Sequence, residues 1–99
     1  MKTITTEELQ KRVEAGEQLN IIDVREADEV AAGMIPGAKH IPLGEVDSRA
    51  GELDKDQPYY MVCRSGARSG KASAYLTEQG IDATNVEGGM LSWNGETQA

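Results

Sequence analysis

The apolar residues of this chain fall into five short runs, with helix signals in the segments between them. The runs centre on Ile4 and on residues 20–24, 39–43, 59–62 and 81–86. Residues 59–62 are unbroken and largely apolar, which is typical of a strand buried on both faces. Short apolar strands that alternate with helices predict an α/β fold with a central, mostly parallel sheet and helices on both faces.

The helix signals lie between these runs. Thr5 and Glu8 have the spacing of a capping box, so a helix is expected from there to about Ala15. A small helix is expected over residues 27–32, and the mixed, acidic residues 44–53 have room for one short helix.

Glycine and proline mark the turns. Residues 33–38 combine Gly, Pro and Gly at spacings that neither a helix nor a strand accommodates. Residues 87–93 are expected to form a tight glycine turn into a terminal helical segment. The tail, residues 94–99, is polar and is expected to fray.

The centre of the chain is a strand, loop and helix over residues 59–79. Cys63, the only cysteine, comes directly after the apolar run, and apolar positions then recur at helical spacing until Gly80. Cys63 therefore faces a helix N-terminus, where unpaired backbone N–H groups and the helix dipole stabilise an anion.

The neighbours of Cys63 favour a reactive thiolate. Arg64 and Arg68 add fixed positive charge, and Gly66 lets the loop fold inward around a bound group. Such surroundings lower a cysteine pKa from ~8.5 to about 3.5–7.5. Most free cysteines are inert and buried, but this polar loop is poorly suited to a core. The sequence therefore predicts that Cys63 is a nucleophile. Its thiol is expected to be partly exposed and to lie in electropositive surroundings.

Composition and charge narrow the possible functions. The 99 residues are expected to form one domain over residues 1–99, without a linker or repeat. The net charge of −7 opposes nucleic acid or an anionic membrane as a partner. A single cysteine cannot form an internal disulfide or a multi-thiolate metal site, so no metal is expected.

The ends of the chain bear on its location. The N-terminus lacks the apolar stretch of a signal peptide, and no segment approaches the ~18–20 apolar residues of a membrane span. We therefore expect a cytoplasmic protein. Met1 and the absence of a linker favour a free-standing chain over an excised domain.

Three separated segments resemble the rhodanese family of single-domain sulfurtransferases. They are residues 22–26 (Ile-Asp-Val-Arg-Glu) with 33–38, the loop 63–69, and residues 86–90 (Val-Glu-Gly-Gly-Met) with Trp93. Their order and spacing span most of the chain. The family often has histidine before the Ile-Pro-Gly turn, where this chain has methionine, and we expect this difference to alter packing more than chemistry.

The resemblance implies a rhodanese-like α/β domain and a persulfide mechanism. Cys63 would attack the outer sulfur of thiosulfate or a related donor, release sulfite and pass the sulfur to a thiophilic acceptor such as cyanide or a thiol. The donor would be held by the loop residues Arg64, Ser65, Gly66, Ala67, Arg68 and Ser69. Their backbone N–H groups would bind the anionic sulfur, and the arginine side chains would orient the donor. No metal or organic cofactor is implied.

Two other functions are weighed against this one. A persulfide carrier or sensor would dock to a thiol-bearing partner protein, and an exposed apolar patch beside the loop would favour it. Phosphatase or arsenate reductase chemistry is less well supported. Cysteine-dependent phosphatases place five residues between cysteine and arginine, whereas four separate Cys63 from Arg68. The shorter loop suits a single sulfur atom better than a tetrahedral oxyanion.

Other polar or aromatic residues are interpreted as structural. His40 lies on a short strand and is left out of the site. Asp23 and Arg25 are expected to form a buried or half-buried pair that ties a strand end to a neighbouring loop. Trp93 is expected to close the C-terminal segment over the sheet.

Overall fold

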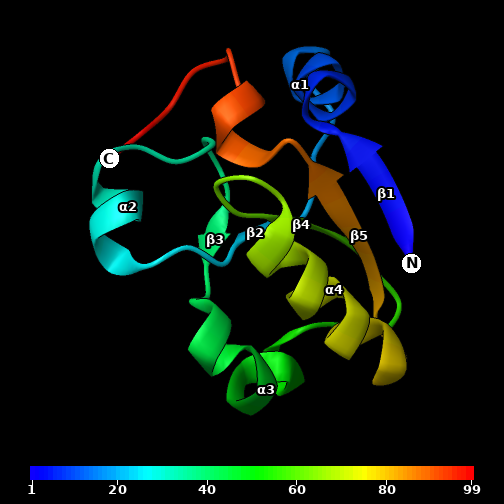
Figure 1. The fold of residues 1–99 in the computed structure, drawn as a ribbon. Helices are drawn as coiled ribbons and strands as arrows, with labels where there is room; N and C mark the ends of the chain where they lie inside the picture. Colours follow the sequence, from blue (N-terminus) through cyan, green and yellow to red (C-terminus); the bar gives the residue numbers. More distant parts are fainter.

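A five-stranded sheet forms the centre of the computed structural model, which describes residues 1–99 (Figure 1). The strands are β1 (Lys2–Thr5), β2 (Ile21–Asp23), β3 (Lys39–His40), β4 (Pro58–Val62) and β5 (Asp82–Glu87). All neighbouring strands are parallel and their order is β1-β5-β4-β2-β3, so β4 lies in the middle. This confirms the predicted α/β architecture.

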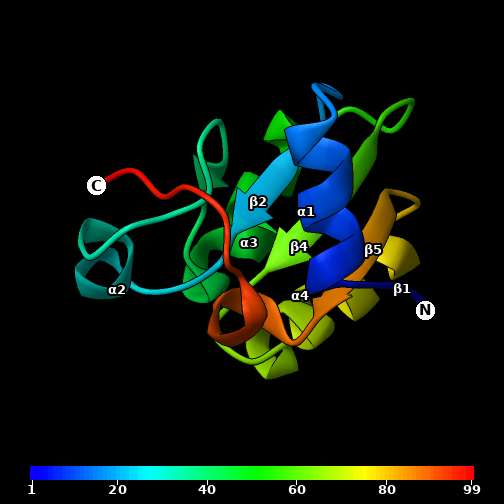
Figure 2. The ribbon, with the colours of Figure 1, turned by 90° about the horizontal axis from the view of Figure 1, so that it is seen from above.

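Helices cover both faces of the sheet. They are α1 (Thr6–Glu14), α2 (Ala27–Ala31), α3 (Val46–Arg49) and α4 (Ala67–Glu78), with 3-10 turns η1 (Leu43–Glu45), η2 (Ala50–Glu52) and η3 (Gly89–Ser92). Figure 1 shows α1 and η3 on one side of the sheet and α3 and α4 on the other, and Figure 2 shows the same layers from above. None of these helices combines the length and apolar character needed to cross a membrane.

The side chains of β4 alternate between two apolar layers. Tyr59 and Met61 pack in the layer under α4, and Tyr60 and Val62 pack in the layer that contains Leu9 of α1. Met61 and Val62 are both fully buried, and burial of a side chain of this size contributes about 1.5–3 kcal/mol. The central strand is therefore buried on both faces, as its apolar run predicts.

Most of the predicted helix boundaries are close to those observed. The backbone N–H of Glu8 donates to Thr5 Oγ1 at 3.1 Å, so Thr5 caps α1 as predicted. Residues 44–53 differ from the prediction, because their helical stretch is divided into η1, α3 and η2. Gly44 and Gly51 lie in η1 and η2, where glycine weakens a regular α-helix.

The C-terminal tail is attached to the body of the protein, so the prediction that it frays is wrong. Met34 and Gln98 exchange backbone hydrogen bonds of 2.7 and 2.8 Å. Trp93 Nε1 donates to the carbonyl of Glu96 at 2.9 Å. Figure 1 shows the red tail beside the turn that follows α2. The pairing uses backbone groups of distant residues, which a local pattern of polar side chains does not show.

The glycine turn before η3 supports the loop after β4. The N–H of Met90 donates to the carbonyl of Cys63 at 2.8 Å, and the N–H of Leu91 donates to that of Arg64 at 3.0 Å. This approach requires Gly89, which has a φ of +51°, because a Cβ there would clash with both carbonyl oxygens. The turn therefore fixes the backbone on which Cys63 sits.

We expect Gly89→Ala to destabilise the protein much more than Gly16→Ala. Both glycines have positive φ, but no atom lies within 4 Å of a Cβ at Gly16. The control therefore loses only about 1–2 kcal/mol of conformational energy, whereas Gly89→Ala also overpacks against two carbonyls and loses about 1–3 kcal/mol more. Urea unfolding of the two variants measures the difference, and equal losses would contradict the role of Gly89.

Candidate active site

Cys63 lies directly after β4, at the carboxyl end of the central strand and at the beginning of the loop that leads into α4. Its side chain is 0% exposed. The prediction of a partly exposed thiol is therefore wrong. The loop composition suggests exposure, but the loop folds back so that Gly66 and Ser69 contact the sulfur.

Hydrogen bonds converge on the sulfur of Cys63. The N–H of Gly66 donates to Sγ at 3.0 Å, and the hydroxyl of Ser69 lies 3.3 Å from Sγ. Burial raises the pKa of the Cys63 thiol, but the Ser69 hydroxyl and the backbone N–H groups of Ser69, Gly66 and Ser65 outweigh it. The pKa is therefore lower than that of an ordinary cysteine, and the buried sulfur is prepared to carry a negative charge.

Further donors surround the same position. Gly66, with a φ of +104°, caps the N-terminus of α4. The backbone N–H groups of Arg64, Ala67 and Arg68 donate to no group of the protein. Free N–H groups at a helix N-terminus bind anions, so the loop can hold a second anionic atom next to Sγ.

A buried asparagine, which the sequence analysis missed, orients Ser69. The Ser69 hydroxyl lies 2.6 Å from Asn85 Oδ1, and Asn85 Nδ2 donates to the carbonyl of Gly66 at 3.2 Å. Ser69 has one hydroxyl hydrogen for two acceptors, so it turns to Sγ when Cys63 loses its proton. An amide at a buried position of β5, next to the apolar Val86, is the signal that points to this role.

The two loop arginines have different surroundings. Arg64 is exposed and forms no ion pair, whereas every other arginine in the chain is paired with a carboxylate. Arg68 donates to both oxygens of Glu29, at 2.6 and 2.8 Å. Glu29, on α2, was not predicted as part of the site. Ser65 and Ala67 are exposed on the loop and at the first position of α4.

The residues interpreted as structural have structural contacts. Arg25 pairs with the fully buried carboxylate of Asp23 at 2.8 Å and donates to the carbonyl of Gly33 at 2.7 Å, so the predicted tie between strand and loop is confirmed. His40 Nε2 lies 2.7 Å from the carbonyl of Arg25. Trp93 is 9% exposed and packs in the layer with Leu9.

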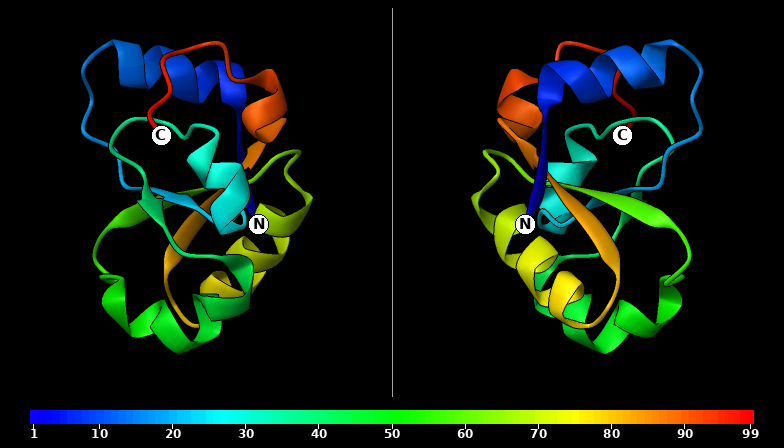
Figure 3. Two further views of the ribbon diagram at one scale, coloured as in Figure 1. Left: turned by 90° about the vertical axis from the view of Figure 1, so that its left-hand side faces the viewer. Right: turned by 90° about the vertical axis from the view of Figure 1, so that its right-hand side faces the viewer.

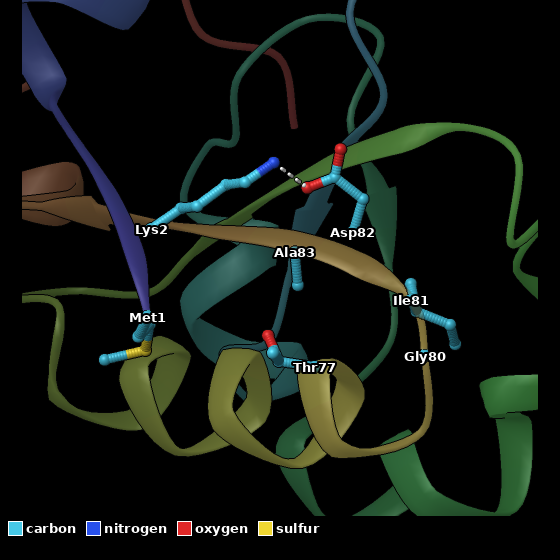
Figure 4. Close-up of a pocket in the computed structure, with 7 residues that line it drawn as sticks. All are labelled: Met1, Lys2, Thr77, Gly80, Ile81, Asp82 and Ala83. Atoms are coloured by element: carbon cyan, nitrogen blue, oxygen red, sulfur yellow. Dashed lines mark hydrogen bonds and ion pairs between the residues drawn. The ribbon is translucent and has the colours of Figure 1, made fainter.

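A surface hollow lies away from this site. It has a volume of about 580 Å³ and is lined by the first residues of β1, the end of α4 and the start of β5 (Figure 4). Lys2 and Asp82, which both line it, form an ion pair of 2.7 Å. It lies at the amino ends of the strands, whereas ligands of parallel α/β sheets bind at the carboxyl ends, where Cys63 lies. No cysteine or histidine lines the hollow.

We expect Ser69→Ala to raise the pKa of Cys63 and to slow its alkylation by iodoacetamide several-fold at neutral pH. The variant removes the hydroxyl that stabilises the thiolate, so the rate profile should move to higher pH. Ser73→Ala is the matched control, because the Ser73 hydroxyl is also buried on α4 but donates to the carbonyl of Ser69 at 2.8 Å. Identical profiles for both variants would exclude the Ser69 hydroxyl as a thiolate donor.

Comparisons with known proteins agree with this geometry. Residues 5–96 match the family model described as "Rhodanese-like domain". The chain is 51% identical over 98 residues to the "Putative sulfurtransferase YtwF" of Bacillus subtilis, covering 99% of this chain and 95% of that protein. It is 44% identical over 96 residues to the "Putative sulfur carrier protein YrkF" of the same organism, covering 96% of this chain and 52% of that protein.

A solved structure gives the same result. The crystal structure of a rhodanese-like domain protein from Staphylococcus aureus superimposes with a TM-score of 0.93 at 43% identity, covering 99% of this chain and 97% of that one. These matches, together with a parallel sheet and a lone cysteine in the loop after its central strand, establish that the chain belongs to the rhodanese family.

Proposed function

We propose that the chain is a sulfurtransferase in which Cys63 accepts a sulfane sulfur as a persulfide and passes it to a second nucleophile. The observation that carries the proposal is the Cys63 sulfur, which receives hydrogen bonds from Gly66 and Ser69 at the carboxyl end of β4. A sulfur held in this way is a thiolate nucleophile. Relatives named as a sulfurtransferase and a sulfur carrier support the same chemistry.

The proposed reaction has two displacement steps. The Cys63 thiolate attacks the outer sulfur of thiosulfate, the sulfur–sulfur bond of the donor breaks, and sulfite leaves with the electron pair. Cyanide or a thiolate then attacks the outer sulfur of the persulfide, and the Cys63 thiolate leaves. In each step the attacking anion is consumed and a leaving anion is formed, so the charges and electrons balance. No metal or redox cofactor takes part. Two half-reactions of this kind give ping-pong kinetics.

The loop would stabilise the persulfide. Its outer sulfur is anionic, and the free N–H groups of Arg64, Ala67 and Arg68 are available to it. The exposed guanidinium of Arg64 would attract the donor, and its backbone is fixed by Leu91. Once the charge moves to the outer sulfur, the Ser69 hydroxyl can return to Asn85, 2.6 Å away.

Access to the sulfur requires the loop to move. Because the Cys63 side chain has no exposed surface, a donor reaches Sγ only when residues 64–68 open. The carbonyl of Arg64 is bound by Leu91 and that of Gly66 by Gly70 and Asn85, so opening the loop breaks some of these bonds but none of the sheet. The site therefore suits donors that present a terminal sulfur atom at the end of a slender group.

A persulfide carrier that works with a partner protein is the second candidate. Leu91 is 65% exposed, and its backbone N–H is bound to the carbonyl of Arg64, so an apolar side chain lies beside the loop. A partner could contact Leu91 while it offers its own persulfide or thiol to Cys63. The phosphatase alternative gains no support, because the Arg68 guanidinium is bound by Glu29 instead of facing an oxyanion.

We predict that thiosulfate adds one sulfur atom to the reduced protein and that cyanide removes it as thiocyanate. Intact-mass spectrometry and a thiocyanate assay measure the two steps. Cys63→Ser should abolish both while the circular dichroism spectrum stays native, because a hydroxyl is a far weaker nucleophile.

The outcomes separate the two candidates. Loading by thiosulfate with turnover supports the enzyme. Loading only by a protein persulfide supports the carrier. Sulfur transfer that persists in Cys63→Ser would remove Cys63 from the mechanism and overturn the proposal.

A further inference from the structure

The charge of Arg68 is already neutralised within the protein. Arg68 Nη1 donates to Glu29 Oε1 at 2.6 Å and Nη2 donates to Oε2 at 2.8 Å, which is the two-bonded geometry that binds a guanidinium most strongly. Glu29 also accepts the backbone N–H of Glu26 at 3.1 Å, so its carboxylate is fixed from two directions. The hydrogen bonds from Arg68 lower the pKa of Glu29 to about 2, so the carboxylate is charged at neutral pH.

This pair lies beside the reactive loop. It joins α2 to the second residue of α4, and Figure 3 (left) views the molecule from the side of the cyan α2, with the yellow-green start of α4 farther back. Arg68 is close enough to Cys63 for the thiolate to raise the pKa of Arg68, although the bonds from Glu29 contribute more. Glu26 adds another carboxylate near Arg68.

The charges around the loop therefore carry no positive excess when Cys63 is ionised. The guanidinium groups of Arg64 and Arg68 are opposed by the Glu29 carboxylate, the nearby Glu26 carboxylate and the thiolate. Of the two loop arginines, Arg68 is bound to a carboxylate and Arg64 forms no ion pair. A dianionic donor would thus approach a site that offers one free positive charge, within a chain whose net charge is −7.

We propose that Glu29 is a specificity-determining residue: by holding Arg68 it makes the site select sulfur donors with one negative charge over donors with two. This inference rests on the proposed sulfur transfer by Cys63. Thiosulfate and methanethiosulfonate form a matched pair of donors. Both transfer an outer sulfur to the thiolate as a sulfur–sulfur bond breaks, and the leaving groups are the sulfite dianion and the methanesulfinate monoanion. The donors differ mainly in charge.

The test compares kcat/KM for the two donors, with cyanide as acceptor, in the native protein and in Glu29→Gln. The amide retains the size of the side chain and an oxygen for the N–H of Glu26, but it leaves the charge of Arg68 uncompensated. We expect kcat/KM to rise about tenfold for thiosulfate and at most about threefold for methanethiosulfonate. If the ratio of kcat/KM for thiosulfate to kcat/KM for methanethiosulfonate is the same in Glu29→Gln as in the native protein, the inference is overturned.

Glu52→Gln is the matched control. Glu52 also binds an arginine through two bonds, of 2.8 and 3.2 Å to Arg49, and its replacement changes the net charge by the same amount. It lines a hollow with Asn20 and Tyr59, at the amino ends of β2 and β4, which is the end opposite Cys63. In this control the ratio of kcat/KM for the two donors should equal that of the native protein. A ratio that rises as much as in Glu29→Gln would assign the effect to net charge alone.

Two further measurements keep the test decisive. Glu29→Gln combined with Arg68→Ala should lose the gain for thiosulfate, because the uncompensated charge is gone, and a persistent gain would contradict the role of Arg68. In the native protein, added salt should lower kcat/KM for thiosulfate only slightly, because Arg64 is the one uncompensated guanidinium at the loop and the chain carries a net charge of −7. A steep fall would overturn the inference even if Glu29→Gln failed to fold.

The same experiment distinguishes this inference from the proposed function. If neither donor loads sulfur onto the native protein, as read by intact mass, the inference fails together with the enzyme candidate of the proposed function, and only the carrier remains. If both donors load but the ratio responds to neither substitution nor salt, only the role of Glu29 fails.

Discussion

The structure depends on one electrostatic requirement, which is that a negative charge on a fully buried sulfur must be compensated by fixed hydrogen-bond donors. Cys63 has no exposed surface, and burial by itself opposes ionisation. The N–H groups of the loop and the hydroxyl of Ser69 supply the compensation, because the central strand ends where α4 begins. A parallel sheet brings a strand end and a helix N-terminus together in this way, so the fold itself creates the site.

The other parts of the fold keep these donors in place. Gly89 allows the backbone of Met90 and Leu91 to approach the carbonyls of Cys63 and Arg64, which anchors the base of the loop. On the other side, Asn85 binds both the carbonyl of Gly66 and the hydroxyl of Ser69. The segment from β5 to η3 therefore does not contact the sulfur, but it positions the groups that donate to it. This explains in physical terms why residues 86–90 belong to the pattern that resembles the rhodanese family.

Most of the fold, but less of the site, could be predicted from the sequence. The apolar runs located the strands within a few residues, because burial on both faces imposes an uninterrupted pattern. Cys63 at the end of β4 was located by the same argument. The burial of the thiol could not be predicted, since it depends on how the loop folds over Sγ. Glu29 and the tail pairing of Met34 with Gln98 were missed, because their partners are distant in sequence.

The most direct test of the central claim is an ultraviolet titration of the single thiolate in the native protein, with the unfolded chain as reference. Because Cys63 is the only cysteine, the thiolate absorbance reports this residue alone. The account predicts a native midpoint below that of the unfolded chain, which should titrate near ~8.5. A native midpoint at or above the unfolded value would show that burial outweighs the hydrogen bonds, and it would contradict the account of Cys63 as a stabilised thiolate.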